Sequence, residues 1–178
     1  MTSRRDPTSF NSPNDDVCLI RSPMALFSQV EKTMKLSLFS DYSLRTLMFA
    51  ALKDDLFQLD EVTNAYGISR NHLAKVVHQL GKLGYLETQR GRGGGIRLAR
   101  RPEDIRIGKI VGETENQSVL VECFNPTTNT CPINGSCRLK GLLTEALGAF
   151  YASLDQYTLR DLVSGPQRAR MSRILLGE

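Results

Sequence analysis

The feature that most constrains the fold is a pair of helical patterns separated by a single glycine. Within residues 60–83, apolar residues recur at spacings of three and four, which places them on one face of a helix. Gly67 interrupts the first pattern and Gly84 ends the second, as expected of a residue that tolerates the left-handed conformation. Asp60 and Ser69 are predicted to cap the two helices. Two short helices joined by a tight glycine-containing turn form a helix-turn-helix. The apolar positions are Val62 and Ala65 in the first helix and Leu73, Val76, Val77 and Leu80 in the second.

A glycine-rich hairpin follows the second helix. Residues 85–89 and 96–98 are predicted strands, and the segment 90–95, RGRGGG, forms the tip between them. The glycines let the backbone approach a groove closely, while Arg90 and Arg92 supply positive charge. A helix-turn-helix followed by such a hairpin is a winged helix. Because these glycines lie between strands and do not open a helix, they do not form a phosphate-binding loop. No nucleophile–base arrangement is found either, so we do not expect an enzyme.

The flanking segments are mainly helical. Residues 40–53 are predicted to form a first helix capped by Ser40 or Asp41. The segment 105–107 is a candidate short strand, and 108–115 is a candidate short helix. The fold class is therefore mainly α with a small β-hairpin wing. The predicted organisation is a winged helix-turn-helix DNA-binding domain at 34–115 followed by a cysteine-bearing loop at 116–137. A long dimerisation helix and a short terminal helix capped by Thr158 follow at 138–163, and a flexible basic tail is predicted at 164–178.

The long helix after Cys137 carries an apolar stripe that is wider than a small domain needs to cover itself. The stripe fits pairing with the same helix of a second chain. The alternative is that the helix folds back on its own core. We favour a homodimer, because winged-helix repressors read two half-sites. The stripe is formed by Leu139, Leu142, Leu143, Ala146, Leu147, Phe150 and Leu154.

The first 33 residues lack sustained periodicity and are predicted to be a disordered extension. Met34 directly precedes the first periodic segment and is a candidate for the true start codon. Cys18 lies in the extension, and no functional role is expected for it. Since no apolar run reaches the roughly 20 residues needed to cross a bilayer and no signal peptide is found, we expect a cytoplasmic protein that does not contact membranes.

Positive charge is concentrated where a DNA-binding surface is predicted. The net charge is only +4, but six arginines and two acidic residues fall between positions 90 and 106. Such a stretch suits a polyanion, most commonly nucleic acid. On the second helix, Arg70 and Asn71 are the candidates for reading base edges in double-stranded DNA, because both side chains make bidentate contacts there. Lys75 and His78 complete the polar face, with Lys75 placed for phosphate.

Three of the four cysteines fall within fifteen residues, in the pattern C-x7-C-x5-C at Cys123, Cys131 and Cys137. A cluster of three cysteines in a cytoplasmic chain suits a metal site better than a disulfide framework. Thiolates favour iron–sulfur clusters, zinc or copper(I). Structural zinc usually has C-x2–4-C spacing and four closed ligands, so an iron–sulfur cluster fits better. Zinc and free thiols stay open as alternatives.

Four segments together resemble the NsrR-type nitric-oxide-sensing repressors, a branch of the iron–sulfur winged-helix family that also contains IscR and RirA. The resemblance covers roughly residues 34–163. The segments are FSDYSLRTLMFAA, YGISRNHLAKVVHQLGKLGYLETQRGRGGGIRLAR, ECFNPTTNTCPINGSCRLKGLLTEAL and LDQYTLRDLV.

This resemblance implies a homodimeric transcriptional repressor that binds one cluster per subunit. The implied ligands are Cys123, Cys131 and Cys137, with Asp41 of the partner subunit as a further ligand. The implied cluster is 4Fe–4S, although the long first cysteine interval leaves 2Fe–2S open. The implied signal is nitric oxide, and the implied targets are promoters of nitrosative-stress or nitrogen-oxide metabolism genes. An iron- or redox-responsive repressor of the RirA or IscR kind is the nearest alternative. An electron carrier would have no use for a winged helix, and a zinc-bound interaction module would be colourless.

Overall fold

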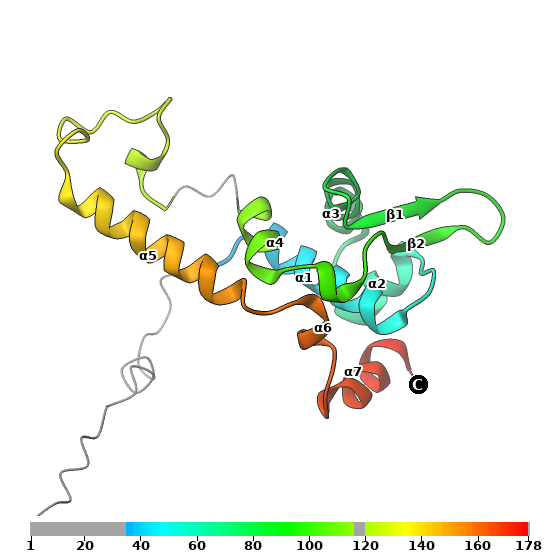
Figure 1. The fold of residues 1–178 in the computed structure, drawn as a ribbon. Helices are drawn as coiled ribbons and strands as arrows, with labels where there is room; N and C mark the ends of the chain where they lie inside the picture. The colour runs from blue at the N-terminus through cyan, green and yellow to red at the C-terminus, as the bar shows by residue number, and fades with distance from the viewer. Residues whose placement is uncertain (1–34, 116–119, 178) are drawn as a thin grey trace, which may run out of the picture. The chain divides into compact units, whose positions relative to one another are not determined.

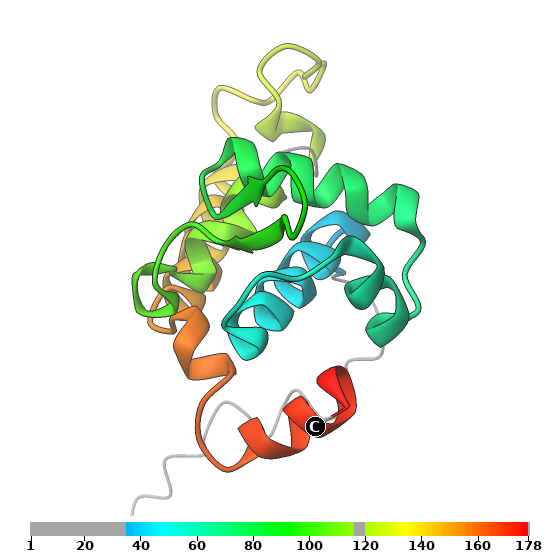
Figure 2. The same cartoon turned by 90° about the vertical axis from the view of Figure 1, so that its right-hand side faces the viewer.

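The computed structural model describes residues 35–115 and 120–177, and all the described helices and strands belong to one compact unit, Leu36–Glu178 (Figures 1 and 2). The extension predicted at 1–33, Cys18 included, lies outside the described residues. In chain order the elements are α1 (Leu38–Lys53), α2 (Leu59–Tyr66), α3 (Arg70–Lys82), β1 (Leu86–Gln89), β2 (Gly95–Leu98), the 3-10 turn η2 (Pro102–Asp104), α4 (Ile107–Thr114), the 3-10 turn η3 (Glu122–Phe124), α5 (Arg138–Leu154), α6 (Leu159–Leu162) and α7 (Gln167–Leu176).

Helix α1 is the centre of the core. It packs against α3, α4, α6, α7 and β2, so its side chains are buried on several sides. Leu47 and Phe49 are almost fully buried, and the Phe49 ring meets Phe57 edge to face at 5.5 Å between centroids. Leu73, Val76 and Leu80 of α3 face the same core, as their spacing predicted. Burying each such side chain stabilises the fold by roughly 1.5–3 kcal/mol.

The caps of α1 and α2 differ from the predicted ones. The Ser37 hydroxyl, and neither Ser40 nor Asp41, caps α1 by accepting from the Ser40 N–H at 3.1 Å. At α2 the cap is Gln58, paired with Glu61 in a capping box, instead of Asp60. Both helices begin earlier than predicted. The residue that caps each one lies two to four positions before the predicted cap. Gly67 ends α2 in the left-handed conformation with φ of 65°, as predicted.

The wing is an antiparallel pair in which Leu86 lies opposite Leu98 and Gln89 opposite Gly95. A third contact, an isolated bridge between Phe57 and Ile96, ties the wing to the segment before α2. Gly94 allows the tight tip, since a Cβ there would lie 2.2 Å from the Gln89 carbonyl oxygen. The wing is therefore anchored at its base and narrow at its tip.

Helices α4 and α5 meet through a glycine. The short strand predicted at 105–107 is only an isolated bridge between Arg106 and Thr158, and Ile107 already begins α4. A Cβ at Gly108 would lie 2.4 Å from the Tyr151 carbonyl oxygen. The Asp155 carboxylate accepts the Lys109 N–H at 3.1 Å and so satisfies a free donor in the first turn of α4. The end of α5 is thus fixed to the start of α4.

We expect Gly108→Ala to lower the free energy of unfolding by about 1–3 kcal/mol, the range for overpacking a close contact. Gly112→Ala is the matched control on the same helix, because a Cβ there meets nothing within 4 Å. The control is expected to be neutral or to stabilise by up to about 1 kcal/mol, since alanine is the better helix former. Urea unfolding of both variants measures the difference. Equal stabilities would show that α4 and α5 do not need this close approach.

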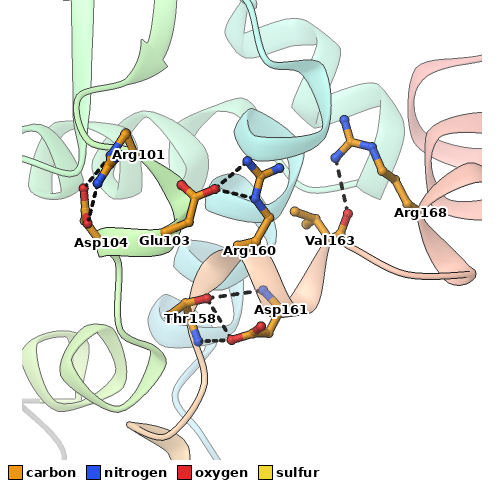
Figure 3. Close-up of polar contacts among 8 residues, drawn as sticks. All are labelled: Arg101, Glu103, Asp104, Thr158, Arg160, Asp161, Val163 and Arg168. Carbon is orange, nitrogen blue, oxygen red and sulfur yellow. Dashed lines mark hydrogen bonds and ion pairs between the residues drawn. The ribbon is translucent and has the colours of Figure 1, made fainter.

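Polar contacts hold α6 in place beside η2 (Figure 3). The Arg160 guanidinium pairs with Glu103 at 2.5 Å, and Thr158 and Asp161 form a capping box at the start of α6. Hydrogen bonds from the Thr158 backbone N–H and then from its hydroxyl hold the pKa of Asp161 below its usual range. Thr158 therefore caps α6 as the sequence predicted.

The tail after residue 164 was predicted to be flexible, and this is wrong. Residues Gln167–Leu176 form α7, which packs on α1 and α2. Met171, Leu175 and Leu176 contact the core, while the Arg168 guanidinium donates to the Val163 carbonyl at 3.3 Å (Figure 3). The tail is rich in basic residues, and its few apolar residues form no clear helical pattern in the sequence, although they order the helix by packing on the core.

Candidate DNA-binding surface and cysteine loop

The recognition helix α3 presents one polar face. With Leu73, Val76 and Leu80 in the core, the opposite face exposes Asn71, Lys75 and His78, as predicted. A polar face of this kind on the second helix of a helix-turn-helix suits the major groove.

Arg70, the other predicted base reader, forms an ion pair with Asp60 of α2. Both side chains are exposed, so the pair contributes little to stability and can exchange for a DNA contact. Asp60 thus acts on the recognition surface and not as a helix cap. Asp60 and Arg70 are ten residues apart and lie on different helices, so no helical periodicity in the sequence predicts their ion pair.

His72 is exposed on α3. Its ring nitrogen Nδ1 lies 3.0 Å from the Ser69 hydroxyl, and its ring lies 6.1 Å from that of Tyr42. The contact with Tyr42 joins α3 to α1. The sequence carried no signal for this contact, because it joins residues that are thirty positions apart.

The arginines between positions 90 and 106 divide into two groups. Arg90 and Arg92 are exposed at the wing tip and have no acidic partner within the part of the chain that the structure describes. The others bond within the protein: Arg97 to Glu87 at 2.5 Å, Arg100 to the Leu83 carbonyl at 3.0 Å and over the Tyr85 ring, Arg101 to Asp104 at 3.0 Å, and Arg106 to the Asp155 carbonyl at 3.3 Å. Within this stretch, the guanidinium groups left without a described protein contact are therefore those at the tip.

Tyr85 connects the base of the wing to α4. Its ring is almost fully buried, and its hydroxyl donates to the Glu113 carboxylate at 2.7 Å. Burial and this hydrogen bond raise the pKa of Tyr85, so the hydroxyl keeps its proton and remains a donor. This hydrogen bond therefore joins the base of the wing to α4.

The three cysteines are half-buried free thiols. Cys123 lies in η3, Cys131 follows in the loop, and Cys137 is the N-cap residue of α5. Among residues 35–115 and 120–177, no three Cys, His, Asp or Glu side chains are gathered into a metal-binding group. The loop therefore supplies three thiols without holding them in a finished ligand arrangement.

Hydrogen bonds organise the cysteine loop from within. One Glu122 carboxylate oxygen accepts from the Thr130 N–H at 2.8 Å and from the Thr130 hydroxyl at 2.7 Å. The Asn129 side chain accepts the Cys131 N–H at 3.0 Å. On the α5 side, the Lys140 ammonium donates to the Asn134 side chain at 2.8 Å. The loop thus has a defined shape around its thiols.

Asp41 lies on the first turn of α1 and is ion-paired with Arg45 at 2.9 Å. The Arg45 guanidinium also lies over the Tyr66 ring, 5.7 Å from its centroid. Asp41 and the cysteines are not brought together in the described part of this chain. A role for Asp41 beside the cysteines would therefore use a second subunit, as the resemblance implies.

The three thiols fit an iron–sulfur cluster in kind and leave one ligand position for another group. Three thiols that are free of disulfides and accessible to solvent are suitable soft ligands, and no histidine lies in the loop to favour a mixed zinc site.

Helix α5 lacks a buried residue along its 17 residues. Leu139 and Leu142 are 60% and 52% exposed. No described helix has the length and apolar character needed to span a membrane. The start of α5 therefore presents an exposed apolar surface, while Phe150 and Leu154 near its end pack against the core.

The family model of Rrf2, described as an iron-dependent transcriptional regulator, matches residues 36–165. The regulator NsrR of Shouchella clausii is 55% identical over 132 residues, covering 73% of this chain and 89% of that protein. NsrR of Bacillus subtilis is 52% identical over 136 residues, covering 75% and 93%. These relatives are transcriptional regulators and not enzymes.

Solved structures agree on the fold. A structure of T. potens IscR matches with a TM-score of 0.57 at 23% identity, covering 73% of this chain and 86% of that one. The oxidised form of Staphylococcus aureus CymR matches with a TM-score of 0.57 at 25% identity, covering 74% and 98%. The winged helix that the sequence predicted is thereby confirmed. The chain belongs to the Rrf2 family of winged-helix transcriptional regulators and, within that family, to the NsrR group.

Proposed function

We propose that this protein is a cytoplasmic, homodimeric repressor that releases its promoters when nitric oxide reacts with an iron–sulfur cluster. The observation that carries the proposal is the presence in one chain of an exposed α3 and wing surface and of a loop with three free thiols that leads directly into α5. The high identity to regulators named NsrR supports nitric oxide as the signal.

Cys123, Cys131 and Cys137 would hold the cluster, with Asp41 of the second subunit as an additional ligand. The cluster is 4Fe–4S in this proposal. When bound, it supplies iron that reacts with nitric oxide. Both carboxylate oxygens of Asp41 are engaged by Arg45, so ligation would share or replace this ion pair.

Dimerisation would bury the exposed stripe of α5. Leu139 and Leu142 lie two and five residues after Cys137, so an α5–α5 interface would place the cysteine loop beside the partner subunit. For Asp41 to be a ligand, this arrangement must also bring the partner's α1 within reach of the loop. It also sets the separation of the two α3 helices, which must match the spacing of the DNA half-sites.

In DNA binding, α3 would enter the major groove with Asn71 on base edges and Lys75 and His78 beside it. The wing tip would lie in or over the adjacent minor groove, where the negative potential attracts arginine. Changes in the loop would reach this surface through α4, the Tyr85–Glu113 hydrogen bond and α1.

For the wing, we expect Arg92→Ala to weaken binding to all double-stranded DNA sequences about equally and to reduce the dependence of log Kd on log salt by about one unit. The physical reason is the loss of one released counterion. Arg97→Ala is the matched control, since Arg97 is engaged with Glu87, and we expect its salt slope to stay unchanged. Titrations at several salt concentrations provide the measurement. An unchanged slope for Arg92→Ala would place the tip away from DNA.

The proposal is tested by the visible spectrum of protein purified without oxygen, recorded before and during titration with nitric oxide. We expect a broad iron–sulfur absorption that bleaches as operator binding is lost. Colourless, zinc-containing protein would overturn the cluster, while a cluster indifferent to nitric oxide would overturn the signal.

A second candidate is an iron- or redox-responsive regulator. The description of the matching family model as an iron-dependent regulator favours it. The two candidates separate when the cluster-loaded protein is treated with oxygen or an iron chelator: loss of operator binding under these agents, and not under nitric oxide, supports the second.

A further inference from the structure

We infer that Glu122 is a positioning residue for the cysteine loop: its carboxylate clasps Thr130 and holds the segments that carry Cys123 and Cys131 together for cluster binding. This inference rests on the proposed function, because it concerns how the chain prepares its thiols for the cluster. It assigns a role to a residue that neither ligates metal nor contacts DNA in that proposal.

The geometry of the clasp is specific. A single Glu122 carboxylate oxygen accepts both the backbone N–H and the hydroxyl of Thr130, at 2.8 and 2.7 Å. The two donors belong to one residue, so the carboxylate fixes both the backbone and the side chain of Thr130. Hydrogen bonds to an ionised acceptor are about twice as strong as neutral ones.

The clasp coincides with the cysteine spacing. Glu122 directly precedes Cys123 and Thr130 directly precedes Cys131, so the clasp closes the same eight-residue interval that separates the two thiols. Consecutive Cα atoms are about 3.8 Å apart, so fixing Glu122 and Thr130 also restricts the positions of the cysteine Cα atoms that follow them. Without it, only local turns would order the seven residues between the cysteines before the cluster binds.

Further contacts continue the same organisation. Asn125 accepts from the Thr127 N–H at 3.0 Å, and Asn129 accepts the Cys131 N–H at 3.0 Å. These bonds are local turns, whereas the clasp is the longest-range side-chain hydrogen bond among the described loop residues 120–137. Glu122 therefore determines how closely the two ends of the first cysteine interval approach.

Positioning of ligands by neighbouring hydrogen bonds commonly changes metal affinity by about 10- to 100-fold. We expect Glu122→Ala to release iron to a chelator faster than the wild type by about that factor. Glu122→Gln keeps a carbonyl oxygen acceptor and should restore most of the retention. Thr130→Val removes the hydroxyl and keeps the N–H, so an intermediate rate is expected.

The matched control is Glu145→Ala, which removes the same charge from an exposed position on α5. Its iron release should equal that of the wild type. Thermal unfolding and binding to non-operator DNA should be unchanged in all the variants, because Glu122 lies outside the core and the winged helix.

A measurement that does not involve the cluster tests the clasp itself. In the full-length apo-protein kept reduced, hydrogen exchange at the amide of Thr130 should be several-fold faster in Glu122→Ala than in the wild type, and unchanged in Glu145→Ala. Faster exchange together with faster iron release supports the inference.

Two outcomes overturn it, and they are distinguishable from a failure of the proposed function. If the wild type binds a cluster but Glu122→Ala retains iron equally well, the positioning role is wrong while the proposed function stands. If the wild type binds no cluster after anaerobic reconstitution, both are wrong.

Discussion

Replacing Cys131 with alanine is expected to yield colourless protein that no longer regulates its operator in response to nitric oxide. The reason is that a cluster held by three thiols of one loop cannot lose one of them and keep its attachment. If the cluster state changes operator binding by 2–3 kcal/mol, its loss alters the affinity by about 30- to 150-fold. Iron and sulfide content, together with operator titrations with and without nitric oxide, measure this. Cys123→Ala and Cys137→Ala should behave alike.

The control for this experiment is Cys18→Ala, which removes a thiol outside the cysteine loop. It should keep colour, iron content and the response to nitric oxide. Nitric-oxide-sensitive repression that persists in Cys131→Ala would sink the sensing model. A winged-helix regulator with a different sensor would remain.

Replacing Asn71 with alanine is expected to weaken operator binding by about 1–3 kcal/mol, or roughly 5- to 150-fold, and to relax the preference at the base it reads. Asn71 is exposed near the start of α3 and has no competing ion pair, unlike Arg70, which pairs with Asp60. Its amide can make two hydrogen bonds to an adenine edge. Binding to the operator and to operators with single base changes measures the effect.

The comparison variant is Lys75→Ala on the same exposed face. Its loss should weaken binding to operator and scrambled DNA about equally, since phosphate contacts carry no sequence information. An equal loss on both DNAs for Asn71→Ala would show that Asn71 contacts the backbone, and base reading would then pass to Arg70.

Much of the DNA-binding domain could be predicted from the sequence because local rules dominate there. The spacing of Leu73, Val76 and Leu80 identifies the buried face of α3 whatever it packs against. Gly67 and the glycines of the wing tip mark turns that other residues form only with strain. These signals are independent of distant partners, so the order of the elements and the exposed residues of α3 follow from them.

Other features were beyond such rules. Charge counting treated the arginines between positions 90 and 106 alike, whereas partners such as Glu87 and Asp104 engage some of them and leave Arg90 and Arg92 at the tip. The prediction for the tail was wrong because only three apolar side chains, among them Met171 and Leu175, order α7. These side chains stabilise the helix only because α1 and α2 lie beside them. A contact between residues that are far apart in the chain leaves no pattern in the sequence near either residue.

The same division applies to the candidate site. The amino-acid sequence alone determined the donor chemistry, three thiols in C-x7-C-x5-C, and the surface chemistry of α3, because both are properties of residue type and spacing. Only the tertiary structure decided that Arg70 is engaged by Asp60, that Leu139 and Leu142 of α5 are left exposed and that Glu122 clasps Thr130. The sequence specifies the residue types directly. Which groups come into contact depends on how packing brings separate backbone segments together.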